Sequence, residues 1–106
     1  MRMNVMKESN SKAVIKPEGR IDVVTSQDLK DMLLELYNEG FDHIVIDFSL
    51  VTSIDSSGLG KLLLFQKKLK ERNGGLSVIN VTSDYIKNMF QMIHLDKVID
   101  IEYAEK

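Results

Sequence analysis

The chain has 106 residues, of which 43% are hydrophobic and 28% are charged, a composition typical of one globular domain. Its 14 Lys and Arg residues and 16 Asp and Glu residues give a formal net charge of -2, which excludes a strong general attraction to nucleic acid or anionic membranes. The absence of cysteine excludes disulfides, thiolate nucleophiles and thiolate metal sites. We therefore expect one domain over residues 1–106, with no nucleic-acid or membrane partner.

The start of the chain, Met1–Ser11, is polar and mixed in charge and lacks the apolar core of a signal peptide. The longest uninterrupted apolar run is Leu62–Phe65, far short of the roughly 20 residues of a membrane span. These features predict a cytoplasmic protein. The carboxylates and the two histidines show no metal-ligand spacing, so we expect no metal and no cofactor.

Two short β-like stretches come first in chain order, at Met3–Val5 and Ala13–Ile15. A polar run separates them, and we expect them to pair as a hairpin. Pro17 is the only proline and has no N–H to donate to a sheet. It is therefore predicted at a sheet edge, a bulge or a strand end.

A helix is predicted next, over about residues 26–39. Thr25 and Ser26 are candidate N-caps, and Gly40 is a natural C-terminal stop. The apolar residues with helical spacing on its inner face are Leu29, Met32, Leu33, Leu36 and Tyr37.

The second half of the chain alternates between β-like and helical patterns. The predicted strands are 43–48 and 76–80, with a further short strand at 98–101, and the predicted helices are 58–71 and one capped by Ser83 or Asp84. Three consecutive aliphatic residues suggest that the 43–48 strand is buried on both faces, and 49–54 is expected to be a connection. The order is β-β-α-β-α-β-α, which predicts an α/β domain with a mixed, mostly parallel sheet of four to five strands.

The residues most suggestive of function lie at the junction of a strand and a helix, in Asp55-Ser56-Ser57-Gly58-Leu59-Gly60. Partners and ligands commonly dock at such junctions, and the backbone N–H groups at a helix start are unpaired. The glycines leave the backbone open to close approach. Capping by Asp55 or Ser56 is the simpler interpretation, but a cap does not account for two serines and two glycines together.

The same segment does not match the common motifs of nucleotide-binding enzymes. A phosphate-binding loop would need Gly and Ser or Thr where the chain has Asp55 and Leu62, and a dinucleotide fingerprint would need a third glycine in place of Leu63. The two histidines, His43 and His94, are not tied by sequence to Ser56 as a general base. We therefore predict that the protein is not an enzyme.

The segment Asp55–Gly60 resembles the core motif of the STAS domains of anti-sigma factor antagonists. The resemblance extends along nearly the whole chain, through Gly19–Asp22, His43–Phe48, Gly74–Leu76 and Ile86–Lys97. Pro17 departs from the family pattern, which usually has a more ordinary strand residue just before the Gly-x-Ile-Asp segment.

The resemblance implies a function switched by phosphorylation. In this family an anti-sigma factor that is also a serine kinase phosphorylates the first serine of the motif, which is Ser56 here. The unphosphorylated protein binds the anti-sigma factor and displaces a sigma factor. The phosphorylated protein is released, and a separate serine phosphatase returns it to the unphosphorylated form. The expected partner-binding residues are Asp22, Thr25, Asp55, Ser56, Ser57, Gly58, Leu59 and Gly60. Asp22 and Thr25 are included because they occupy the preceding strand-to-helix junction, on what should be the same sheet edge.

The chemistry of the motif is consistent with such a switch. A phosphate on Ser56 would add about -1.5 to -2 charge beside Asp55, and a helix N-terminus accommodates such a charge. A partner built to receive a neutral hydroxyl would then meet a bulky like charge, with little change in fold.

Several alternatives stay open at this point. Ser57 is a second possible acceptor, although the family position favours Ser56 and Ser57 is expected to cap the helix or position Ser56. Leu62–Phe65 is either fully buried or exposes one residue to a partner. The module could also serve another partner-switching pathway, in stress or biofilm regulation, or bind a nucleotide. Weak self-association is also undecided.

Overall fold

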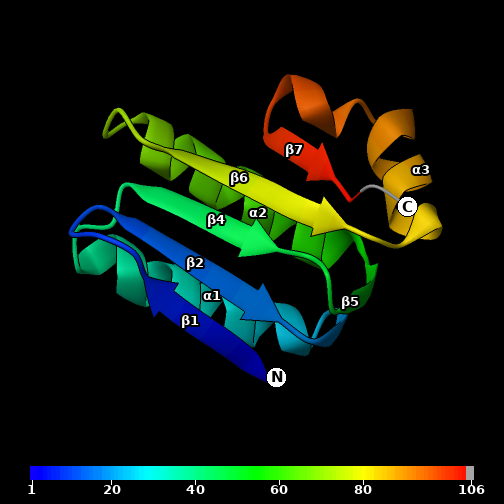
Figure 1. Ribbon diagram of the computed structural model, residues 1–106, viewed down its shortest axis with the longest axis horizontal. Coiled ribbons are helices and arrows are strands. Elements are labelled where there is room, and N and C mark those ends of the chain that lie inside the picture. The colour runs from blue at the N-terminus through cyan, green and yellow to red at the C-terminus, as the bar shows by residue number, and fades with distance from the viewer. Residues whose placement is uncertain (105–106) are drawn as a thin grey trace.

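The computed structural model describes residues 1–104, and the last two residues lie outside the described part (Figure 1). The strands are β1 (Met3–Lys7), β2 (Lys12–Pro17), β3 (Gly19–Ile21), β4 (His43–Asp47), β5 (Val51–Ile54), β6 (Gly75–Val81) and β7 (Asp100–Tyr103). The helices are α1 (Thr25–Asn38), α2 (Ser56–Lys70), α3 (Asp84–Met92) and the short 3₁₀ helix η1 (Leu95–Lys97). None of the helices within residues 1–104 has the length and apolar character needed to cross a membrane.

The main sheet has five strands in the order β1-β2-β4-β6-β7, with β1 antiparallel to β2 and every other pair parallel. This confirms the predicted mixed, mostly parallel sheet and its N-terminal hairpin. Pro17 is the last residue of β2, opposite Met3, so its predicted place at a strand end is also confirmed.

Two additional short strands correct the predicted order of elements. β3 and β5 pair in parallel as a separate two-stranded sheet, although residues 49–54 were expected to be a connection. The prediction was wrong because strands of three and four residues carry too few side chains to show an alternating pattern. Their pairing with each other, through contacts distant in sequence, is what fixes them as strands.

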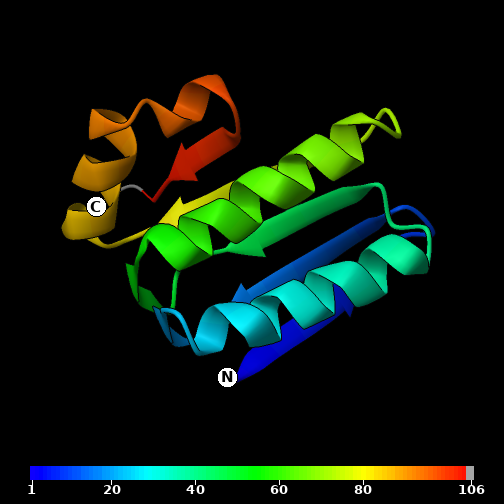
Figure 2. The same ribbon diagram turned by 180° about the vertical axis from the view of Figure 1, so that it is seen from behind.

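The helices α1 and α2 lie side by side on one face of the main sheet, as Figure 2 shows from behind. The core fills the space between these helices and the sheet, and its largest fully buried side chains include Phe48, Phe65, Phe90, Ile15, Ile44 and Ile46. The prediction that the 43–48 strand is buried on both faces was wrong. Ile44 and Ile46 are fully buried under the helices, whereas Val45 between them is only half-buried on the uncovered face.

The start of α1 differs from the prediction that Thr25 or Ser26 caps it. The N-cap is Val24, whose backbone is already helical and whose side chain makes no capping hydrogen bond. Ser26 lies in the first turn of the helix and is completely buried. At α3, by contrast, Ser83 caps as predicted, because its hydroxyl accepts a hydrogen bond of 3.2 Å from the N–H of Ile86.

Helix α2 begins at Ser56, two residues earlier than expected, and its apolar run is divided between two environments. Leu62 and Phe65 are buried in the core, whereas Leu63 and Leu64 are 42% and 41% exposed. Full burial of the run is therefore wrong, and two leucines rather than one face solvent. The reason is geometric, since four consecutive residues of a helix span more than one turn and cannot share one face.

Candidate functional site

The site is built on the small sheet of β3 and β5. Their parallel register places Ile21 beside Ile54, and Asp22 and Asp55 each follow directly at the carboxyl end of their strand. The Asp55 N–H donates to the Ile21 carbonyl at 3.0 Å, which ties the two loops together. The sequence therefore correctly placed Asp22 near the Asp55–Gly60 segment, although on this second sheet and not on the main one.

Asp55 is the N-cap of α2. Its backbone is extended, and its carboxylate accepts hydrogen bonds from the N–H groups of Ser57 and Gly58 at 2.9 and 3.2 Å. One carboxylate thus satisfies two of the four N–H groups that a helix start leaves unpaired. The expectation that Ser57 caps the helix is corrected, because Ser57 contributes only its backbone N–H as a donor to Asp55.

The two serines of the motif differ in accessibility. Ser56, the first residue of α2, is exposed, whereas Ser57 is half-buried. Within residues 1–104 the Ser56 hydroxyl makes no hydrogen bond. Ser56 therefore presents a free hydroxyl to solvent from a backbone that Asp55 holds in place.

The two glycines of the motif play different roles. A Cβ on Gly58 would lie 2.6 Å from Ile21 Cγ2 and 2.7 Å from Ile54 Cγ1, so the helix packs directly on the small sheet there. The expectation that Gly58 opens the backbone to an outside partner is therefore wrong. Gly60 is exposed, and a Cβ there would meet nothing within 4 Å, so at this position the helix surface is open.

Asp22 organises the neighbouring loop. Its carboxylate accepts hydrogen bonds from the N–H groups of Val24 and Thr25 at 3.0 and 2.9 Å, and the Thr25 hydroxyl accepts from the Asp22 N–H at 2.8 Å. The Thr25 hydroxyl also lies 2.7 Å from the Arg20 carbonyl, to which it donates. The hydrogen bond from the Thr25 backbone, aided by the Val24 backbone and the Thr25 hydroxyl, lowers the pKa of Asp22 against the opposing effect of desolvation.

Sequence reasoning missed the two residues at the tip of this loop. Val23 and Val24 are 66% and 74% exposed, and they lie between Asp22 and Thr25. Adjacent β-branched residues in a strand-to-helix turn are unusual, because turns favour Gly, Asn, Asp and Ser, and that signal was present in the sequence. Leu59, which was expected to contact a partner, is half-buried and packs against the core.

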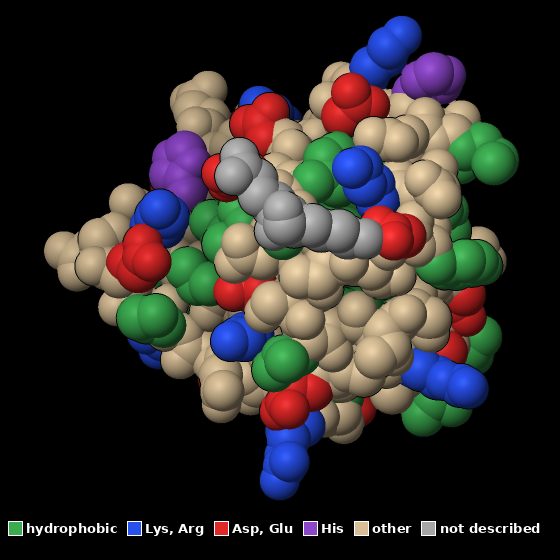
Figure 3. Space-filling model, turned by 45° about the vertical axis from the view of Figure 1, so that its right-hand side comes forward, with side chains coloured by type: hydrophobic (Ala, Val, Ile, Leu, Met, Phe, Trp, Pro, Cys, Tyr) green, Lys and Arg blue, Asp and Glu red, His purple; other side chains and the backbone are tan. Residues whose placement is uncertain are grey.

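The surface around this end of the molecule has neither a mainly positive nor a mainly negative charge. On the face shown in Figure 3, Lys and Arg side chains are interspersed with Asp and Glu side chains. Among residues 1–104, no three His, Asp or Glu side chains come together as a metal site. The arrangement is that of a small binding domain, which exposes a serine hydroxyl at the start of α2 and two valines on the neighbouring loop. Asp55 and Asp22 hold these two segments in place through hydrogen bonds to the backbone.

Comparisons with known proteins agree with this class. The family described as "Mlab, STAS domain" matches residues 5–101. The anti-sigma-B factor antagonist of Bacillus subtilis (strain 168) is 30% identical over 102 residues, covering 95% of this chain and 92% of the relative. The chain therefore belongs to the STAS-domain family of anti-sigma factor antagonists. Antagonists of this kind regulate by binding, so the prediction that the chain is not an enzyme is confirmed.

Solved structures show the same fold. The unphosphorylated form of the anti-sigma factor antagonist SpoIIAA has a TM-score of 0.81 at 19% identity, with 99% of this chain and 90% of that chain covered. The phosphorylated form of SpoIIAA from Bacillus has a TM-score of 0.76 at 19% identity, with 99% and 93% covered. The predicted α/β architecture is thereby confirmed, whereas the extension of the domain over all of residues 1–106 stays a prediction.

Proposed function

We propose that this chain is a cytoplasmic anti-sigma factor antagonist switched by phosphorylation of Ser56. Unphosphorylated, it binds an anti-sigma factor that is also a serine kinase, and a sigma factor is freed. Phosphorylated, it is released, and a serine phosphatase returns it to the binding form. The observation that carries this proposal is the exposed, unbonded Ser56 hydroxyl at the first position of α2.

Accessibility favours Ser56 over Ser57 as the acceptor. A kinase must bring the hydroxyl oxygen to the γ-phosphate of its nucleotide, so the side chain has to project from the surface. Ser56 is exposed, whereas Ser57 is half-buried and its N–H is held by Asp55. We therefore expect Ser57→Ala to leave phosphorylation largely intact and Ser56→Ala to abolish it.

The charges around Ser56 explain why a phosphate there would break a contact. Asp55 already accepts hydrogen bonds from two N–H groups of the helix start, so the phosphate finds few free backbone donors. It would carry about -1.5 to -2 charge directly beside the Asp55 carboxylate, with Asp22 on the adjacent loop. A partner surface fitted to Asp55 and a neutral hydroxyl then meets concentrated like charge, which costs several kcal/mol at a buried contact.

The binding surface would run from Ser56 along α2. Gly60, Leu63 and Leu64 follow Ser56 at helical spacings of four, seven and eight residues, so they share its exposed side. Leu63 and Leu64 supply exposed apolar area, and Gly60 allows close approach. We propose that this stripe, together with the loop containing Val23 and Val24, contacts the anti-sigma factor.

The first test compares wild type, Ser56→Ala and Ser56→Asp as baits in lysate of the source organism, with mass spectrometry of the retained proteins. We expect Ser56→Ala to retain a kinase of the anti-sigma type that Ser56→Asp releases. Ser57→Asp is the matched control for added charge one residue away. If all baits retain the same proteins, or none retains a kinase, Ser56 is only the first residue of a capped helix.

A second test addresses the docking stripe. Leu64→Ala removes exposed apolar area, so we expect weaker binding of the purified kinase with nearly unchanged melting. Leu62→Ala, a buried neighbour on the same helix, should instead destabilise the fold by about 2–5 kcal/mol. If Leu64→Ala and Leu63→Ala both bind the kinase as wild type does, α2 does not form the binding surface.

A further inference from the structure

One face of the five-stranded sheet is uncovered, because α1 and α2 both lie on the other (Figures 1 and 2). We call this surface the open face, formed by alternate residues of β2, β4 and β6 beginning at Lys12, His43 and Gly75. The β1 residue Met6, 60% exposed, projects beside it. We propose that two copies of the chain associate weakly and reversibly through their open faces.

The strand register arranges the open face in rows. Met6, Val14, Val45, Ser77 and Asp100 lie side by side across the five strands. The row therefore begins with apolar side chains and ends with a small polar residue and a carboxylate. Val14 and Val45 occupy the middle of the first four positions, so a two-fold axis between β2 and β4 would place valine on valine, as a symmetric interface requires.

The next row along the strands adds charge of both signs. Lys16 of β2 and Asp47 of β4 project from adjacent strands, and Ile79 of β6 lies beside Asp47. Desolvation alone would raise the pKa of Asp47, but its hydrogen bonds with Ser49 and Asn80 and the nearby Lys16 charge outweigh it, so the pKa is lowered. The open face thus presents a cation and an ionised carboxylate at neighbouring positions.

A two-fold axis parallel to the strands, between β2 and β4, brings these groups into register. Each β2 then faces β4 of the second copy, so that Val14 lies over Val45 and Lys16 lies over Asp47, twice in the dimer. A two-fold axis perpendicular to the strands would instead place each β2 over β2 of the second copy, so that its Lys12 and Lys16 would face the same two lysines. Like-charge contact disfavours that arrangement, so the charges select the first.

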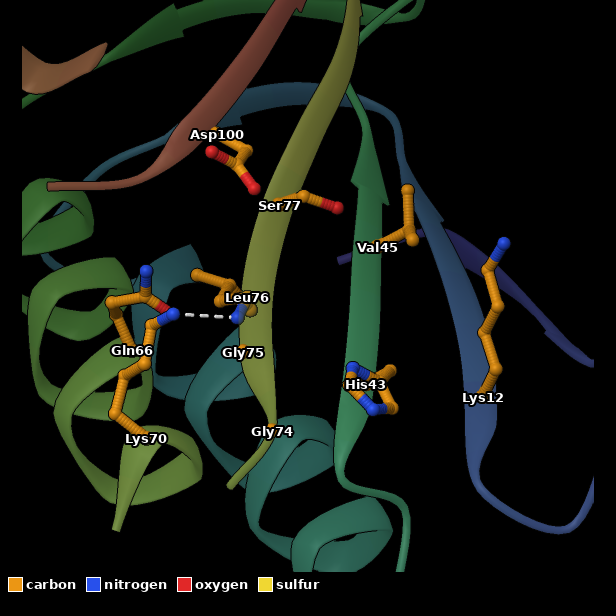
Figure 4. A pocket seen from close by; sticks show the side chains of 10 residues that line it. All are labelled: Lys12, His43, Val45, Gln66, Lys70, Gly74, Gly75, Leu76, Ser77 and Asp100. Carbon is orange, nitrogen blue, oxygen red and sulfur yellow. Dashed lines mark hydrogen bonds between the residues drawn. The ribbon is translucent and has the colours of Figure 1, made fainter. Parts of the chain in front are cut away.

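The shape of the open face suits the same arrangement. A hollow of about 380 Å³ lies beside the start of β6, where Gly75 and Ser77 supply little side-chain volume (Figure 4). His43 and Val45 line it from the open face, and Gln66 and Lys70 line it from α2. With the axis between β2 and β4, Met6 of the second copy lies over Ser77. An exposed, flexible methionine thus faces a hollow that small residues create.

The area of contact indicates a weak dimer. Four strands spaced about 4.8 Å apart, each offering about 17 Å of length, cover roughly 330 Å² of each copy in projection. Stable complexes bury about 800 Å² per partner, so this interface exchanges rapidly and depends on concentration. The open face lies opposite the helix layer that carries Ser56, so partner binding and self-association do not compete for the same surface.

The test is sedimentation equilibrium of the purified protein from about 10 μM to about 1 mM. We expect wild type to self-associate and Val45→Glu to raise the dimer dissociation constant at least about tenfold. Val98→Glu, a 54% exposed valine outside the open face, is the matched control and should associate as wild type does.

Charge exchange tests the register. Lys16→Glu alone should weaken association, and the combination of Lys16→Glu with Asp47→Lys should restore it. Melting curves establish that each variant is folded. A wild type that stays monomeric over the whole range, or Val45→Glu that associates as tightly as wild type, overturns the proposal. Neither result bears on kinase binding through Ser56.

Discussion

Gly58→Ala tests the packing of α2 on the small sheet. The added methyl carbon would lie 2.6 Å from Ile21 and 2.7 Å from Ile54, well inside van der Waals contact. These isoleucines are only 1% and 4% exposed, so neither can move out into solvent. Overpacking of this kind costs about 1–3 kcal/mol, and the helical preference of Ala over Gly returns at most about 1 kcal/mol. We expect a net destabilisation of about 1–2 kcal/mol.

Gly60→Ala is the matched control, because it makes the same chemical change two residues later in the same helix. A Cβ on Gly60 meets nothing within 4 Å, so only the helical preference acts, and stability should rise by about 0.5–1 kcal/mol. Urea unfolding followed by circular dichroism measures both variants. The two substitutions should shift the midpoint in opposite directions, with unchanged denaturant dependence.

The packing argument fails if Gly58→Ala is as stable as wild type. It also fails if both substitutions shift stability in the same direction, because local helix preference would then dominate over contact with the small sheet. Gly60→Ala has a second use. If it is folded and more stable but binds the anti-sigma factor less well, the added methyl group lies in the proposed binding surface.

Two further predictions concern buried and titrating polar groups. Gln66→Leu should destabilise the fold by about 2–4 kcal/mol in urea unfolding, because the Gln66 amide accepts from Leu76 N–H at 2.6 Å and donates to the Val98 carbonyl at 2.7 Å, and both would lose their partner. Folding lowers the pKa of Asp22, so its contribution to stability is present at neutral pH and is lost as the pH falls below about 4. Asp22→Asn should therefore flatten the acid side of a stability-against-pH curve, and an unchanged acid limb would contradict this.

The sequence predicted the elements that carry enough side chains to show a pattern. The helices around Leu29–Leu36 and Leu62–Leu69 display apolar spacing over several turns, and β4 is a continuous β-branched run. β3 and β5 escaped prediction because their stability comes from pairing with each other and not from local pattern. The partial exposure of Val45 was not predicted for a related reason. The sequence of a strand does not show whether helices cover one face of its sheet or both.

The sequence predicted the location of the candidate site correctly, but the roles that it predicted for several residues were wrong. Asp22 and Asp55 were correctly brought together, because each closes a strand that leads into a helix. The roles of Thr25, Ser57 and Gly58 depend on which N–H, carbonyl or side chain lies within about 3 Å, and residue type alone does not determine that. Asp22, three residues before the first helical residue Thr25, accepts N–H hydrogen bonds at the start of α1, the role that was expected of Thr25.

The position of Asp55 also determines how α2 responds to negative charge on Ser56. An anion in the first turn of a helix normally stabilises it by about 0.3–1 kcal/mol. Here the Asp55 carboxylate already accepts from the N–H groups of the first turn, so Ser56→Asp should gain little or nothing in stability. Asparagine caps helices about as well as aspartate but carries no charge, so Asp55→Asn removes the repulsion while keeping the cap.

In the Asp55→Asn background, Ser56→Asp should therefore be more stabilising than in wild type by about 0.5 kcal/mol, a difference that a double-mutant cycle in urea isolates. Equal effects in the two backgrounds would show that the two side chains do not interact. An interaction of the expected sign would mean that Asp55 occupies the backbone N–H groups that would otherwise stabilise a negative charge on Ser56. That charge would then be directed at the binding partner, and no rearrangement of the domain would be needed to release it.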